Sequence, residues 1–199
     1  MNTSPQPARP SGERQAAWSG VTGFAVALIG SAVLGLPAGL IWGEAAPRAL
    51  LQEIGTGTAE VVNAETSAFI GADAWFCGIA AVTGLITGLL GYRFLVAPRA
   101  GGARAAATAG LILGGLAGAF VLLWLGEQIG LSAYQHHLAS SPNGTMFNAS
   151  LSLGAKSALS FWPMLTAIVI LIAEWSGRRT AEPADPQLPL GYGAPPGTP

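Results

Sequence analysis

The stretch Glu65 to Phe94, ETSAFIGADAWFCGIAAVTGLITGLLGYRF, decides the fold predicted for this chain. Its small residues recur in steps of three or four, which returns them to one face of a helix with about 3.6 residues per turn. The seam they form comprises Asp73, Cys77, Ala80, Gly84, Gly88 and Gly91. The opposite face carries the bulky side chains of Trp75, Ile79, Val82, Ile86, Leu90 and Phe94. Small residues let membrane helices approach closely, so we expect the seam to face protein and the bulky side chains to face lipid.

The composition places the whole chain in a membrane. Of its 199 residues, 51% are hydrophobic and only 10% are charged, whereas soluble domains average about 25% charged residues. The net charge of −1 leaves no basic stripe for nucleic acid. The single cysteine, Cys77, excludes an intramolecular disulfide and a four-thiolate metal site. Abundant Ala, Gly, Pro and Arg are typical of a bacterial protein, so we expect a multi-pass protein of the plasma membrane.

Four apolar stretches predict an all-α fold, a four-helix transmembrane bundle packed as two antiparallel hairpins. The expected helices are residues 17–43, 67–96, 104–127 and 156–176, each long enough for a hydrocarbon core of about 30 Å. Polar, proline-rich tails at residues 1–16 and 177–199 should be disordered. The glycines expected at the packed helix faces are Gly35, Gly39, Gly84, Gly88, Gly110, Gly114 and Gly118.

Basic residues predict that both termini are cytoplasmic. In that orientation the inside holds Arg9, Arg14, Arg93, Arg99, Arg104, Arg178 and Arg179, and the outside holds only Arg48 and Lys156. The positions of the tryptophans are consistent with the same orientation, if they form aromatic belts at the two membrane boundaries. Trp18 and Trp175 then mark the inner boundary, and the outer boundary holds Trp42, Trp75, Trp124 and Trp162. Two polar loops, residues 44–66 and 127–156, face outward, and the segment PRALLQEI in the first could form a short interfacial helix.

Asp73 is the strongest candidate functional residue, because a carboxylate facing a bundle interior is a functional hypothesis by default. The alternative is a helix N-terminal charge favoured by the macrodipole and paired with Lys156. Glu65 lies two turns above Asp73 and, with Glu53 and Glu60, could form a cation-attracting vestibule. The plain alternative for these glutamates is a solvated loop.

The remaining polar residues predict no catalytic, cofactor or metal site. His136 and His137 are adjacent, so their side chains diverge, whereas metal ligands on a helix favour a spacing of three or four. Nucleophile-elbow, Walker and Rossmann signatures do not occur. Glu174 is expected to form an i,i+4 ion pair with Arg178. The chain is therefore not expected to be an enzyme.

The acidic loop leading into ETSAFIGADAWF and the glycine hairpin GLITGLLGYRF resemble uncharacterised four-helix integral membrane proteins of actinobacteria, which form a domain family of unknown function. The resemblance covers about residues 17–175. It implies a membrane location and no activity, cofactor or catalytic residue.

Three functions fit these observations. The leading one is a non-enzymatic envelope component or an accessory subunit of a membrane complex, with the bilayer and a membrane protein or second copy as partners. The alternative is a small cation- or proton-coupled transporter or channel that uses Asp73 and Glu65. A membrane enzyme with loop-borne acids and histidines is the third.

Overall fold

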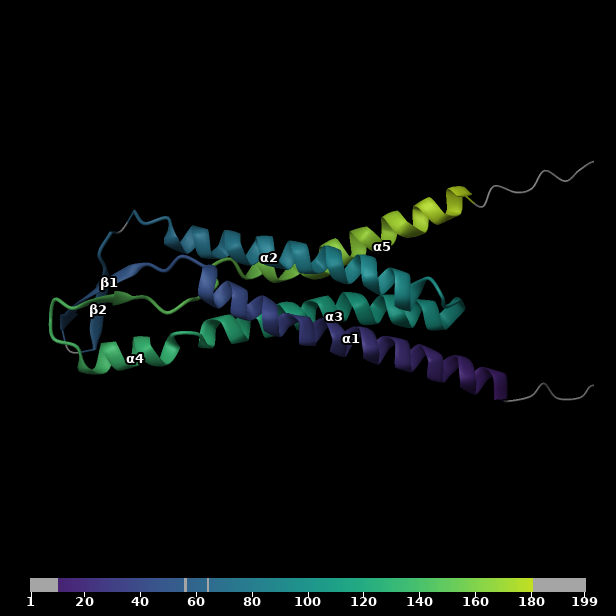
Figure 1. Cartoon of the computed structure of the whole chain (residues 1–199), viewed down its shortest axis with the longest axis horizontal. Coiled ribbons are helices and arrows are strands. Elements are labelled where there is room, and N and C mark those ends of the chain that lie inside the picture. Colours follow the sequence, from purple (N-terminus) through teal and green to yellow (C-terminus); the bar gives the residue numbers. More distant parts are fainter. Residues whose placement is uncertain (1–10, 56, 64, 181–199) are drawn as a thin grey trace, which may run out of the picture.

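Four long helices form the body of the molecule in a computed structural model that describes residues 11–55, 57–63 and 65–180 (Figure 1). Within these ranges, side chains are described for residues 17–177. The long helices are α1 (Ser11–Ala45), α2 (Ala68–Gly91), α3 (Gly101–Gln128) and α5 (Phe161–Thr180). A π-helical segment, η1 (Tyr92–Val96), extends α2, and a 3-10 turn, η2 (Lys156–Ser160), leads into α5. Across the described residues, four helical stretches are long and apolar enough to cross a membrane, as the sequence predicts.

The helices run further than hydropathy predicts. Residues 11–16, expected in the disordered N-terminal tail, form the first turns of α1, and α5 continues to Thr180 instead of ending at residue 176. α3 also begins early, at Gly101. Hydropathy marks the apolar part of a helix, whereas its backbone hydrogen bonds continue into polar sequence. The rest of the predicted tails, residues 1–10 and 181–199, lies outside the described residues.

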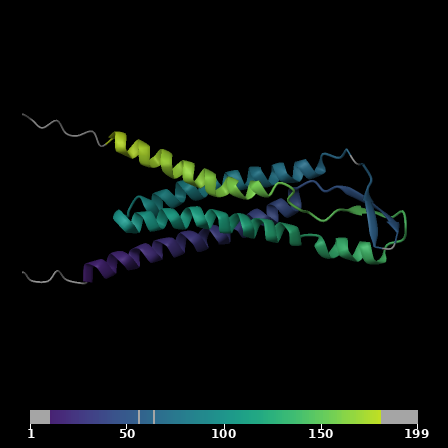
Figure 2. The same ribbon diagram turned by 180° about the vertical axis from the view of Figure 1, so that it is seen from behind.

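The predicted packing into two antiparallel hairpins is corrected by the structure. Consecutive long helices are antiparallel, but the closest pairs are α1 with α3 and α2 with α5, and the two helices of each pair run in the same direction (Figures 1 and 2). α3 also contacts α5, which joins the two pairs. The glycine faces of α1, α2 and α3 favour this arrangement, because glycine lets the backbone or side chains of a neighbouring helix approach closely.

All seven glycines expected at packed faces lie at these two interfaces. A Cβ added to any of them would fall 2.5–2.9 Å from an atom of the neighbouring helix. Gly35 faces the carbonyl oxygen of Gly118 across the α1–α3 interface, and Gly84 faces that of Trp162 across the α2–α5 interface. Even an alanine would therefore push the backbones apart at these crossings.

Two of the six tryptophans are core residues, which corrects the predicted outer aromatic belt. Trp42 and Trp162 are both 0% exposed. The Trp42 indole N–H donates to the carbonyl of Ala72 (2.9 Å), and its ring meets Phe76 edge-on at 5.2 Å between centroids. The other four tryptophans, Trp18, Trp75, Trp124 and Trp175, are exposed. Position along the helix alone cannot separate these groups, because the helix face determines burial.

A small mixed layer, here named the cap, extends beyond one end of the helices (Figure 1). It contains β1 (Leu50–Gly55), β2 (Thr58–Val61), α4 (Leu131–Ser140) and β3 (Met146–Asn148), with strand order β2-β1-β3. Both strand pairs are antiparallel. The prediction of an interfacial helix at PRALLQEI is therefore wrong. Most of that segment belongs to strand β1, and the rest leads into it. Its partner β3 comes from the other loop, so local sequence could not reveal the pairing.

Candidate functional site

The carboxylate of Asp73 joins α2 to the loop that precedes α5. Its Oδ1 accepts a hydrogen bond from the backbone N–H of Gly154 (3.0 Å), and its Oδ2 accepts one from Ala155 (2.9 Å). Asp73 is half-buried, and the two residues that donate to it directly precede η2, which begins at Lys156. The negative charge therefore sits at the N-terminal end of η2 and α5, where the helix dipole favours it. This geometry describes a structural anchor between distant segments.

Glu65 does not join Asp73 in a site. The Glu65 side chain is exposed, and its backbone N–H donates to Asn63 Oδ1 (3.0 Å) in the bend before α2. Glu53 is not available to the predicted vestibule either, because this residue of β1 is only 1% exposed. Thr58 donates its N–H to Glu53 Oε1 (3.4 Å), whereas Oε2 has no hydrogen-bond partner among the described residues.

Arg48 connects the ends of α1 and α3 at the base of the cap. One of its guanidinium nitrogens, Nη2, donates to the carbonyls of Gly43 (2.6 Å) and Ile129 (3.0 Å). Both carbonyls belong to helix C-terminal ends, where the dipole favours a cation. At the other end of the molecule, Arg99 likewise donates to the carbonyl of Leu95 near the end of η1. Arg48 and Arg99, two of the basic residues on which the predicted topology depends, therefore also bind carbonyls at helix ends.

Glu174 forms its ion pair with a residue that the sequence did not suggest. Its carboxylate lies 3.2 Å from Arg104 Nη2, so the pair links α5 to α3. The side chain of Arg178, the partner expected from i,i+4 spacing, lies outside the described side chains. The long-range pair reinforces the α3–α5 contact but is partly solvated, so we assign it a modest energy.

The histidines do not form a metal centre in the described part of the chain. His136 and His137 lie 6.2 Å apart between ring centroids, and each is near a serine one turn further along the chain. His137 also stacks on Phe147 at 5.5 Å. No group of three or more His, Cys, Asp or Glu side chains there is arranged to hold a metal ion.

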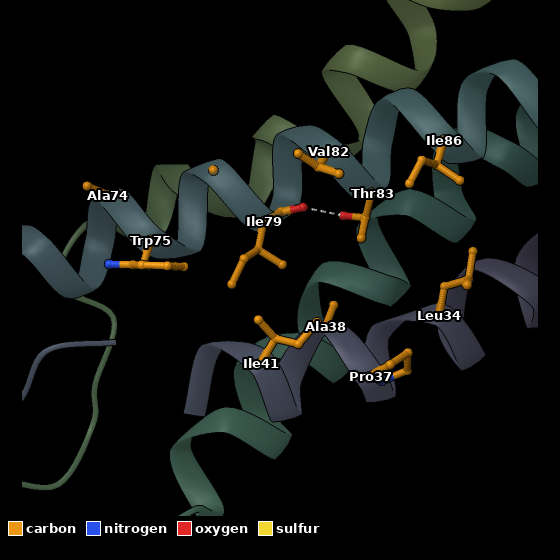
Figure 3. A pocket seen from close by; sticks show the side chains of 11 residues that line it. Leu34, Pro37, Ala38, Ile41, Ala74, Trp75, Ile79, Val82, Thr83 and Ile86 are labelled. Atoms are coloured by element: carbon orange, nitrogen blue, oxygen red, sulfur yellow. Dashed lines mark hydrogen bonds between the residues drawn. The ribbon is translucent and has the colours of Figure 1, made fainter. Parts of the chain in front are cut away.

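A lateral groove between α1 and α2 is a hollow that sequence reasoning missed (Figure 3). It has a volume of about 650 Å³. The lining residues are Leu34, Pro37, Ala38 and Ile41 of α1, with Ala74, Trp75, Gly78, Ile79, Val82, Thr83 and Ile86 of α2. The Thr83 hydroxyl donates to the carbonyl of Ile79 (2.7 Å), so the groove presents almost only hydrocarbon. A second hollow of about 310 Å³ shares Leu34 and Ile86 with it and continues along the same two helices.

The comparisons with protein-family models, curated proteins and solved structures find no match to this chain. The resemblance to actinobacterial four-helix proteins therefore remains a prediction from sequence.

Proposed function

We propose that this chain is a non-enzymatic integral membrane subunit that acts by assembling with another membrane protein. Its four apolar helices would span the plasma membrane with both termini in the cytoplasm and the cap outside. The observation that carries the proposal is the way in which the polar groups between the helices are used. Among the described residues, the buried hydroxyls between the helices have partners within the protein, and the two buried arginine nitrogens without one, Arg99 Nε and Arg104 Nε, lie at the end of the bundle opposite the cap.

Among the side chains that the structure describes, three buried hydroxyls lie within the apolar helices, and each has an internal partner. Ser31 donates to the carbonyl of Ala27 (2.8 Å), and Thr166 donates to that of Gly84 (3.1 Å). Thr87 accepts the indole N–H of Trp162 (3.2 Å). Transporter sites place unsatisfied polar groups or broken helices near the midplane. Here the hydroxyls of Thr87 and Thr166 bond across the α2–α5 interface, and that of Ser31 bonds within α1.

Asp73 supports the same proposal, because both of its oxygens are engaged by backbone N–H groups of the loop before α5. A coupling carboxylate must exchange its partner for an ion or proton during transport. Releasing Asp73 would instead free two N–H groups at the start of η2. A transporter that uses Asp73 and Glu65 is therefore the less favoured alternative.

The groove between α1 and α2 opens sideways from the helices and is lined by apolar atoms. In the proposed orientation, anything that enters it comes from the hydrocarbon of the bilayer. This access suits a hydrophobic neighbour and gives a polar solute no favourable contact. The groove therefore favours a subunit that assembles with another membrane protein over a carrier of polar solutes.

The test is crosslinking in native membranes, followed by mild solubilisation, affinity capture and mass spectrometry. We expect a second membrane protein at fixed stoichiometry. Recovery of this chain alone, or only with copies of itself, would contradict the proposal. A second experiment measures cation or proton flux in vesicles reconstituted with the Asp73→Asn variant. Loss of a cation or proton flux in a variant that remains folded would support the transporter.

A further inference from the structure

The sheet of the cap has one covered face and one open face. Strand residues that pair directly point to the same side of a sheet. Leu51 pairs with both Val61 and Phe147, and their side chains face α4, where Tyr134 and Leu138 pack against the cluster. The alternate residues of β1 must point the other way. The open face therefore comprises Leu50, Gln52, Glu60, Val62, Met146 and Asn148, and the exposed Ile54 follows Glu53 at the irregularity in the β1–β2 register.

Large apolar side chains occupy much of this open face. Their exposed fractions are 43% for Leu50, 52% for Ile54, 46% for Val62 and 57% for Met146. Val62 extends β2 by donating its N–H to the carbonyl of Leu50 (3.0 Å), so its side chain lies beside that strand. Outside the bilayer, exposed apolar side chains gathered on one sheet face, here interleaved with Gln52 and Glu60, mark an interaction site. The exposed side of α4 contrasts with it, since Ser132, Gln135 and His136 point to solvent there.

The open face carries one acidic side chain, and the exposed charge at the base of the cap is also mostly acidic. Glu60 lies within the face, directly opposite Gln52, and Glu44 and Glu65 are exposed where the cap meets α1 and α2. Of the two basic residues in the cap loops, Arg48 is engaged by helix carbonyls and Lys156 is exposed beside η2. Three exposed carboxylates thus outnumber one exposed ammonium group. A partner that complements this surface needs basic residues around an apolar centre.

We infer that the open face of the cap sheet docks the extramembrane domain of a partner protein, through apolar side chains flanked by lysine or arginine. This inference rests on the proposed function and names the part of the chain that performs it. Leu50, Ile54, Val62 and Met146 supply the apolar contact, and Glu60 sets the charge preference. The negative charge of Glu60, with the exposed carboxylates at the base of the cap, would also raise the rate at which a basic partner associates.

The experiment uses the full-length chain in its native membranes, with the photo-crosslinking residue p-benzoylphenylalanine at single positions. Gln52→p-benzoylphenylalanine places the probe at the centre of the open face. Gln135→p-benzoylphenylalanine is the matched control on the exposed side of α4. We expect an adduct from position 52 and little from position 135, with a crosslinked partner peptide that carries Lys or Arg beside apolar residues. Adding Glu60→Lys should lower the yield about fivefold, and Glu60→Gln should lower it less, without changing the melting temperature.

Failure of this inference can be separated from failure of the proposed function. If native gels show a stoichiometric complex but position 52 gives no adduct, the docking face is wrong and the accessory role stands. An adduct only with lipid or with a second copy also overturns the docking face, as does a yield that Glu60→Lys does not change. If no complex forms at all, both proposals fail.

Discussion

Asp73 Oδ2 lies 2.9 Å from the backbone nitrogen of Ala155, so α2 and the start of the last helical segment are joined across 82 residues of chain. The neighbouring N–H of Gly154 binds the other oxygen of the same carboxylate. A single side chain thereby holds the loop after β3 against the helical body. The residue singled out as a transport candidate is, in this geometry, an anchor for the cap.

Asp73→Ala should destabilise the protein by about 1–3 kcal/mol, because it leaves two backbone N–H groups without their charged acceptor. Asp73→Asn should cost less, since the amide oxygen still accepts one of the two bonds. Thermal unfolding and limited proteolysis of the loop at residues 149–156 measure both effects. Glu65→Ala is the control and should change stability by less than about 0.5 kcal/mol, because that side chain is exposed. Equal effects at the two positions would contradict the anchor.

Gly35→Ala should weaken the α1–α3 interface by about 1–3 kcal/mol, because its Cβ would lie 2.5 Å from the carbonyl oxygen of Gly118. Gly30→Ala on the same helix is the matched control. Its Cβ would meet nothing within 4 Å, so the better helix propensity of alanine should leave stability unchanged or raise it by up to about 1 kcal/mol. Unfolding in mixed detergent micelles compares the two variants. If Gly30→Ala were as damaging as Gly35→Ala, the close crossing would be misplaced.

Arg48→Gln should destabilise the cap end of α1 and α3 by about 1–2 kcal/mol, because the guanidinium bonds to terminal carbonyls of both helices. Lys156→Gln removes the same charge from an exposed side chain and should have little effect. Hydrogen exchange of residues 43–48 and 126–130 gives the local readout. Faster exchange in both segments of Arg48→Gln is expected, and unchanged exchange would exclude the bridging role.

Topology can be tested with single cysteines in a Cys77→Ala background. Ala139→Cys in α4 should react with a membrane-impermeant thiol reagent from outside, and Ala100→Cys in the α2–α3 turn should react only after permeabilisation. Both positions are exposed. Ala103 is less suitable for the probe, since it packs near Gly20 of α1. The reverse labelling pattern would overturn the predicted orientation and place the cap in the cytoplasm.

The sequence predicted the helices because their signals are local. Apolar stretches and glycine spacing of three or four residues follow from the helical repeat. They identified the protein-facing residues Ala80, Gly84, Gly88 and Gly91 of α2, which are buried as the spacing predicts. The same periodicity placed Val82, Leu90 and Phe94 on the exposed side. Spacing could not show which helix each glycine face would meet.

The candidate site was predictable only in part. Asp73 was recognised as an inward-facing carboxylate, but its partners, Gly154 and Ala155, are loop residues without a distinctive sequence signal. The burial of Glu53 likewise depends on the pairing of β1 within the cap, and the alternating pattern of β1 is too short to stand out in the sequence. The groove between α1 and α2 depends on the angle between two helices, which no single helix encodes.

By itself, the sequence determined that this protein has four apolar helices with glycine faces, because helix formation and close approach depend on residues three or four apart. The tertiary structure alone decided the parallel pairing of α1 with α3 and of α2 with α5, the burial of Trp42 and Trp162, and the sheet that joins the two loops. Each of these depends on contacts between residues far apart in the chain. Such contacts form only where the packing of the whole molecule lets their buried surface and hydrogen bonds offset the lost chain entropy.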